Sequence, residues 1–224
     1  FEKKGVTVVP NADLIPEYAI GGEFSAQRTF GKNFITVGGT AFTTYLFNAM
    51  VQRDFTLDGN DSILYNGDMT KVQAIVNTNN AIVYGTAAFL KLNFTENFNF
   101  EYNYNFTKGI DLAADIPLEH IPPQFGRIAL TYAGQKLNTS LYTFYNFRKR
   151  FSDYAAGGDN IDLTPNEAGT PPWWTLNYRV SYQFFGTITT QFAIENILDV
   201  HYMQFASGIS GNGRNFMFSL KADF

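Results

Sequence analysis

The residue types that could carry out chemistry are few in this chain and widely separated. Its two histidines, His120 and His201, stand in segments expected to be loops. An imidazole there could bind a haem iron or serve as the base of a hydrolase, but an ordinary loop histidine is the favoured interpretation. No base is spaced with a nucleophile, and no carboxylates are paired, as acid–base or covalent catalysis requires. The sequence therefore predicts neither an enzyme nor a cofactor site.

Metal and phosphate sites have equally little support. Asp153 and the segment DNID at 159–162 could offer oxygen ligands to Ca²⁺, yet their order differs from that of an EF-hand loop. The segment GISGNGRN at 208–215 lacks the order of a phosphate-binding fingerprint. Cysteine is absent, which excludes disulfides and thiolate metal sites. These segments are interpreted as solvated loops, and no metal site is predicted.

The composition indicates a surface that is half apolar and half polar. Aromatic residues make up 17% of the chain, and polar residues are interspersed among them. A soluble core would concentrate Leu, Ile and Val, whereas a sheet with lipid on one side and water on the other alternates aromatic and polar residues. The net charge of −4 gives no basic footprint and argues against a nucleic-acid partner.

Strict alternation marks two segments as amphipathic strands. In 98–108, FNFEYNYNFTK, the aromatic residues fall on one face and the Asn, Glu and Thr residues on the other. The segment 174–184, WTLNYRVSYQF, repeats this pattern. A half-buried soluble sheet is the alternative, but it would need a second layer, and no amphipathic helix is found to supply one.

Nine strands of this kind are expected. They cover residues 16–30, 34–48, 82–94, 98–108, 124–133, 137–148, 173–184, 187–196 and 214–224. The uncharged stretch 34–52 is long enough to cross a bilayer as a helix. Its Gly-Gly pair, four threonines and several aromatic residues favour a strand instead.

The connections between these strands alternate in length. Short turns join the strands in pairs, and long polar segments at 49–81, 109–123, 149–172 and 197–213 separate the pairs. Outer-membrane barrels have this arrangement, with turns in the periplasm and loops outside the cell. Because complete bacterial barrels have an even number of strands, nine strands predict that the chain enters from an extracellular loop and that further strands precede Phe1.

Three motifs resemble the C-terminal part of the TonB-dependent outer-membrane receptors. NADLIPE at 11–17 is similar to an Asn-Pro-x-Leu-x-Pro-Glu strand entry, with Ala12 in place of the proline. PLEHIPPQFGRIALTY at 117–132 is similar to a Pro-Pro-x-x-x-x-Arg entry. The most specific is FAIENILDVHYMQF at 192–205, followed by GRNFMFSLKADF, in which ENILDVHY stands for Glu-Asn-Leu-x-Asp-x-x-Tyr. Nearly the whole chain aligns with such a half-barrel.

The resemblance implies an all-β fold, a transmembrane antiparallel β-barrel of 22 strands, to which residues 1–224 contribute about nine C-terminal strands of one barrel domain. It implies that a plug, a TonB box and the other strands lie upstream, and that the protein resides in the bacterial outer membrane. The implied function is TonB-driven uptake of a scarce, bulky ligand such as an iron–siderophore complex, haem or cobalamin. An ending typical of glycan importers is not found, which favours a siderophore-like ligand. The alternative is a small complete barrel with a structural or adhesive role.

Particular residues acquire expected roles through this resemblance. The terminal Phe224 is similar to the aromatic residue that the barrel-assembly machinery recognises, and its ring could rest in the interfacial girdle. The candidate lumen residues are the basic side chains assigned to polar strand faces, Lys91, Arg127, Arg148 and Arg179. They would contact plug carboxylates, the favoured role, or guide an anionic ligand; on a lipid face each would cost about 2–4 kcal/mol near the midplane. The basic run at 148–150 would meet lipopolysaccharide phosphates or loop carboxylates at the outer rim.

Overall fold

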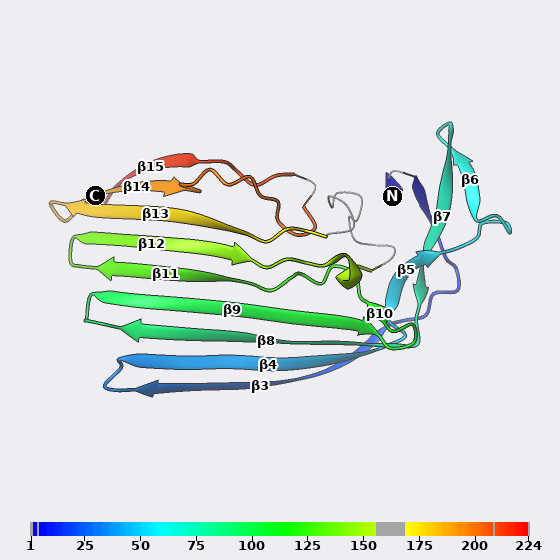
Figure 1. Ribbon diagram of the computed structural model, residues 1–224, viewed down its shortest axis with the longest axis horizontal. Coiled ribbons are helices and arrows are strands. Elements are labelled where there is room, and N and C mark those ends of the chain that lie inside the picture. Colours follow the sequence, from blue (N-terminus) through cyan, green and yellow to red (C-terminus); the bar gives the residue numbers. More distant parts are fainter. Residues whose placement is uncertain (1, 4, 156–168, 208, 224) are drawn as a thin grey trace.

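Two β-sheets make up the protein, and the smaller one stands at one end of the larger one (Figure 1). The computed structural model describes residues 2–3, 5–155, 169–207 and 209–223. Within those residues the helical structure is confined to a short 3-10 turn, η1 (Phe151–Asp153). No helix in the described part of the chain has the length and apolar character of a membrane span.

The larger sheet is antiparallel throughout. Its strands are β3 (Tyr18–Phe30), β4 (Ile35–Phe47), β8 (Asn80–Asn93), β9 (Phe98–Asp111), β10 (Ile116–Pro117), β11 (Phe125–Ala133), β12 (Leu137–Asn146), β13 (Trp173–Phe184), β14 (Ile188–Glu195) and β15 (Asn215–Ala222). They lie in the order β15-β14-β13-β12-β11-β9-β8-β4-β3, and the short β10 pairs with β9. All nine long strands were predicted, with bounds within three residues of those observed. The stretch considered as a helix contains strand β4.

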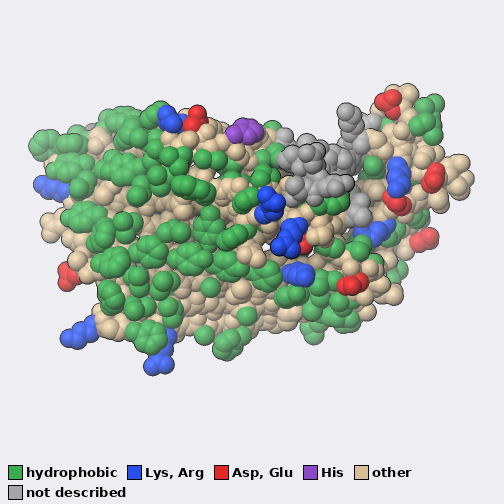
Figure 2. All heavy atoms as spheres, in the orientation of Figure 1, with side chains coloured by type: hydrophobic (Ala, Val, Ile, Leu, Met, Phe, Trp, Pro, Cys, Tyr) green, Lys and Arg blue, Asp and Glu red, His purple; other side chains and the backbone are tan. Residues whose placement is uncertain are grey.

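The register of the larger sheet separates its residues onto two faces, because directly paired residues of neighbouring strands point to the same side. Tyr102 of β9 pairs with Ile128, and Leu141 of β12 pairs with Tyr178; these residues belong to what we term the apolar face. The intervening residues, such as Asn103, form the polar face. Hydrophobic side chains cover these strands in Figure 2.

The two ends of the larger sheet differ, as the connection lengths predict. Tight turns join β3 to β4, β8 to β9, β11 to β12 and β13 to β14 at what we term the turn end, on the left in Figure 1. In the first of these, Gly31, Lys32 and Asn33 all have positive φ, and the Phe34 N–H donates to the Gly31 carbonyl oxygen at 3.1 Å. The opposite, loop end carries the long connections and the second sheet.

The smaller sheet corrects the prediction that residues 49–81 form a long polar loop. Its strands are β1 (Glu2–Lys3), β2 (Val6–Val9), β5 (Met50–Asp54), β6 (Ser62–Tyr65) and β7 (Asp68–Asn77). Strand β7 lies between β2 and β5, pairs with β2 in parallel, and also pairs with β6. Val9, Val72 and Ala74 form a buried cluster against Ile63 and Val76. This segment therefore folds because it encloses a small core of its own.

Both edges of the larger sheet are open. Strand β3 pairs only with β4, and β15 pairs only with β14, within the described residues. Every residue of β3 is exposed. A sheet with two free edges is a partial barrel, which does not fit the alternative of a small complete barrel.

Candidate functional site on the polar face

Charged side chains from three neighbouring strands meet on the polar face. The Lys91 Nζ atom of β8 lies 3.6 Å from Glu101 Oε1 of β9, and Arg127 Nη1 of β11 lies 3.8 Å from Glu101 Oε2. The Arg127 guanidinium also lies over the Tyr142 ring, 5.1 Å from its centroid. Two positive charges thus share one carboxylate at distances too long for strong hydrogen bonds. This group keeps a positive charge that an anionic ligand or a plug carboxylate could meet.

Arg179 and Arg148, the other two candidates, have different surroundings. Arg179 of β13 is opposite Ser140 and Ala193 on the polar face, is exposed, and forms no ion pair within the described ranges. Arg148 follows the end of β12 and lines a cavity together with Lys108, whose register places it on the apolar face. The shared face predicted for these basic residues therefore includes Lys91, Arg127 and Arg179 but does not extend to Arg148, because strand alternation ends at Asn146.

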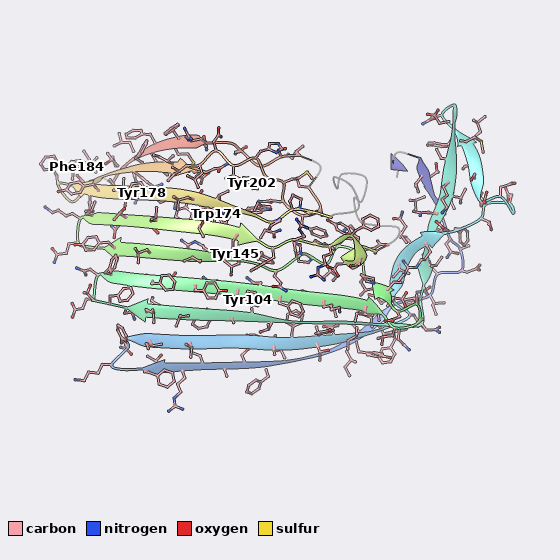
Figure 3. All side chains as sticks on the ribbon, in the orientation of Figure 1. Tyr104, Tyr145, Trp174, Tyr178, Phe184 and Tyr202 are labelled. Carbon is pink, nitrogen blue, oxygen red and sulfur yellow. The ribbon has the colours of Figure 1, made fainter. Side chains whose placement is uncertain are left out.

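An aromatic cavity of about 420 Å³ lies at the loop end of β11 to β14. Phe144, Trp173, Tyr202 and Phe205 line it together with the amides of Asn146 and other residues. The Trp173 and Tyr202 ring centroids are 4.5 Å apart, and the buried Trp173 Nε1 atom has no hydrogen-bond partner among the described residues. Figure 3 shows Tyr202 in the loop that follows β14, beside the start of β13. Rings, amides and a free N–H donor suit a ligand with ring and oxygen groups.

The loop that carries Tyr202 is held by the motif at 195–202. Asn196 is only 2% exposed. Its Nδ2 donates to the carbonyl oxygens of Val200 and Asn212, at 2.8 and 3.0 Å, while its backbone N–H donates to Asn177 Oδ1 at 2.9 Å. The motif therefore orders the wall of the cavity. The sequence identified this motif but did not reveal that it orders the loop that carries Tyr202.

Asp111 joins the two sheets and was missed by the sequence reasoning. It is 1% exposed at the loop-end terminus of β9, beyond the aromatic residues of that strand. Its Oδ2 accepts from Arg53 Nη2 of β5 at 3.0 Å, and its Oδ1 accepts from Thr78 Oγ1 at 2.9 Å and from the backbone N–H groups of Ala113 and Ala114. Burial alone would raise the pKa of Asp111, but these hydrogen bonds outweigh it and hold the pKa below its usual range. A lone Asp in the segment 109–123, which was expected to be a loop, gave no signal of this role.

The two histidines lie in connections at the loop end of the larger sheet. His201 Nε2 lies 3.0 Å from Ser210 Oγ, and His120 is exposed with a φ of 59°. Across the described residues, no three His, Cys, Asp or Glu side chains gather as metal ligands would. Asp153 Oδ2 accepts from the Arg150 backbone N–H at 3.2 Å. The DNID segment considered for Ca²⁺ and the terminal Phe224 both lie outside the described residues.

A family model described as "TonB dependent receptor-like, beta-barrel" matches residues 3–197. The match covers most of the chain, so the chain belongs to the TonB-dependent receptor β-barrel family, as its motifs predicted. The family is one of transport receptors of the bacterial outer membrane. No curated protein sequence is significantly similar to this chain.

Solved structures confirm the barrel fold. The copper transporter OprC is 13% identical with a TM-score of 0.75, over 94% of this chain and 32% of that one. The siderophore receptor PirA from Acinetobacter baumannii is 20% identical with a TM-score of 0.69, over 97% and 33%. The ferric enterobactin receptor PfeA from Pseudomonas aeruginosa, a mutant in complex with enterobactin, is 16% identical with a TM-score of 0.72, over 98% and 33%. This chain thus spans about a third of the length of these receptors.

Proposed function

We propose that residues 1–224 form the C-terminal part of the barrel domain of an outer-membrane receptor, and that this receptor imports an iron–siderophore-like ligand with energy from the TonB complex. The observation that carries the proposal is the polar face, where the group of Lys91, Glu101 and Arg127 and the aromatic cavity belong to one sheet. Membership of the transport-receptor family supports a role in transport.

The chemistry of the polar face favours a bulky ligand with anionic and ring groups. Lys91 and Arg127 share one carboxylate, and Arg179 has none among the described residues, so this part of the face attracts negative charge. Glu195 lines the aromatic cavity and adds a negative charge there. The rings of Trp173 and Tyr202 add a surface on which a flat ligand group can pack. One of the similar structures is titled a siderophore receptor and another a ferric enterobactin receptor, which agrees with this chemistry.

The same proposal assigns partners to the open parts of the sheet. The free edges of β3 and β15 would pair with the remaining barrel strands, and the polar face would enclose an N-terminal plug. The apolar face would contact membrane lipid. Recognition of Phe224 by the barrel-assembly machinery stays a prediction.

Uptake by the full-length receptor tests the transport proposal. In cells that lack other receptors, the intact protein should import radioactive iron from at least one siderophore and should lose this import when TonB is deleted. Replacing Arg127 by Gln and Trp173 by Ala together should weaken ligand binding at least about tenfold. Lys136→Gln, an exposed change in a turn at the opposite end, is the control and should leave binding unchanged. TonB-independent import, or binding that is equal in all three proteins, would overturn the proposal.

A further inference from the structure

Lys149 is a buried lysine at the point where three connections of the loop end meet. It follows β12 and is only 3% exposed. Its Nζ atom donates to the Ile121 carbonyl oxygen, in the connection before β11, at 2.6 Å. The same atom lies over the rings of Tyr154, before β13, and Phe205, before β15, at 4.5 and 4.1 Å from their centroids. One ammonium group thus joins three connections that are separate in the sequence.

The contact with Phe205 links Lys149 to the aromatic cavity. Phe205 lines this cavity together with Trp173 and Tyr202. Lys149 lines a different cavity, the one that contains Arg148, so its ammonium reaches the Phe205 ring from behind the wall. We propose that Lys149 is a positioning residue, which fixes the Phe205 ring in the wall of the aromatic cavity and thereby strengthens ligand binding. This inference rests on the proposed function, because that function assigns ligand groups to this cavity.

The backbone of Lys149 is held by the far end of its own connection. Its N–H donates to the Thr170 carbonyl oxygen at 3.1 Å. Gly169 has a φ of 74°, and a Cβ atom there would lie only 2.1 Å from the Lys149 carbonyl oxygen, so this close approach requires glycine. The Tyr154 hydroxyl is hydrogen-bonded to the Thr170 hydroxyl, and both residues are buried. Lys149 therefore extends its ammonium from an ordered backbone.

An ammonium group is an unusual choice for this buried place. Removing a charge from water is unfavourable, and an apolar side chain of similar length, such as that of Met, would fill the same volume without that penalty. The Ile121 carbonyl oxygen and the two ring faces compensate the buried charge. Because a cation–π contact depends on where the cation lies over the ring, the ammonium favours one position of the Phe205 ring among those that packing alone would allow.

A Phe205 ring that is already in place favours binding, because the ligand does not have to order it. Each side chain that becomes immobilised on binding reduces the affinity. The rings of Tyr154 and Phe205 lie 6.1 Å apart, so Tyr154 also restricts the position of Phe205. The cavity therefore presents a preformed aromatic wall, and loss of the ammonium should mainly speed ligand dissociation.

Fluorine NMR of the full-length receptor in detergent micelles tests the position of Phe205 without a ligand. With 4-fluorophenylalanine at position 205 alone, the unchanged protein should give one fluorine resonance. In K149M this resonance should shift and should broaden or split, because the ring then has several positions. The control K108M makes the same substitution at an exposed lysine of the loop end and should leave the resonance unchanged. Several resonances in the unchanged protein, or an identical spectrum in K149M, would overturn the proposal.

Ligand binding tests the consequence of this position. The probe is the ferric siderophore whose iron the receptor imports in the uptake test above. K149M should bind it at least about tenfold more weakly, and K149R, which keeps a cation over the rings, should recover most of the affinity. In the F205L background, K149M should cause hardly any further loss, because both substitutions disturb the same wall. Additive losses, no recovery in K149R, or equal affinity of K149M and the unchanged protein would overturn the proposal.

The two measurements separate this proposal from the proposed function. If the Arg127 and Trp173 double variant loses binding while K149M binds normally, the present proposal fails alone. If no siderophore is imported, the proposed function fails, and the fluorine spectra still decide whether Lys149 fixes Phe205. Should K149M fold poorly, the spectra of the unchanged protein and of K149R decide the outcome. Each of these two should show one resonance, and several resonances in either would overturn the proposal.

Discussion

The two sheets of this protein place their hydrophobic residues in opposite environments. In the five-stranded sheet, Val72 and Ala74 are fully buried against neighbouring apolar side chains. In the ten-stranded sheet, Phe24, Phe218 and Trp174 remain 73%, 72% and 51% exposed. Water would penalise the second arrangement over so wide a surface, whereas lipid would stabilise it. The contrast shows that the five-stranded sheet suits water and the apolar face of the ten-stranded sheet suits lipid. Asp111 links the two sheets.

The largest expected effect comes from placing a charge in the small core. Val72→Asp buries a carboxylate without a partner, which should cost more than about 4 kcal/mol and unfold the five-stranded sheet. Hydrogen exchange should rise sharply in residues 50–77 and stay low in residues 98–146. The control is Leu64→Asp in the same sheet, where the side chain is 70% exposed, and it should change little. Equal loss of protection in both sheets would show that they do not fold as separate units.

A charge on the apolar face should be the next largest disturbance. Tyr178→Arg places a guanidinium toward lipid and should reduce stability in vesicles by about 2–4 kcal/mol. Its neighbour Arg179 already carries a guanidinium on the polar face. Ser181→Arg, on that polar face, is the matched control and should be close to neutral. Unfolding in urea from lipid vesicles measures both, and equal costs would contradict the assignment of faces.

Removing the link between the sheets should have a smaller effect. Asp111→Asn leaves Arg53 without its carboxylate and weakens the hydrogen bonds from Thr78, at a cost of about 2–3 kcal/mol. Limited proteolysis should then cut near residues 48–50 and 78–80 sooner. Asp54→Asn breaks an exposed pair with Lys71 and should change cleavage hardly at all.

The pH dependence of this link should be the weakest of the four effects. The pKa of Asp111 is lowered in the folded protein, so its ionised form favours folding at pH values above the unfolded pKa of about 4. That contribution is lost as the pH falls from there through the lower folded pKa. The protection of residues 50–80 against hydrogen exchange, taken relative to the intrinsic exchange rate at each pH, should therefore decrease as the pH falls from 5 to 3. Asp111→Asn should remove this pH dependence, and an unchanged profile would contradict the role of Asp111.

Local alternation was enough to predict the nine long strands but not the second sheet. In strands such as β9, the alternation of apolar and polar residues identifies the strand and its two faces. Short turns then determine which strands pair. The parallel pair of β2 and β7 joins residues more than sixty positions apart, for which no local pattern exists. The Asn66-Gly67 turn, with φ values of 50° and 91°, was a local hairpin signal that could have identified β6 and β7.

The candidate site could be predicted only for residues that lie within the strands. The alternation of side chains along each strand placed Lys91, Arg127 and Arg179 on one face, as the register shows. It could not reveal that Glu101 lies between two of them, because that depends on the stagger of three strands. Arg148 follows the end of a strand, where alternation no longer determines side-chain direction. The cavity at Trp173 depends on a loop folded by Asn196, which periodicity does not describe.

The central claim is that the two faces of the larger sheet meet different solvents, and accessibility along β9 tests it most directly. Single cysteines at Tyr102, Asn103, Tyr104 and Asn105 can be introduced into this cysteine-free segment of the full-length receptor in lipid vesicles. Spin labels at Tyr102 and Tyr104 should be relaxed by oxygen dissolved in lipid, and those at Asn103 and Asn105 by a water-soluble nickel reagent. Equal accessibility at all four positions, or the reverse alternation, would contradict the account.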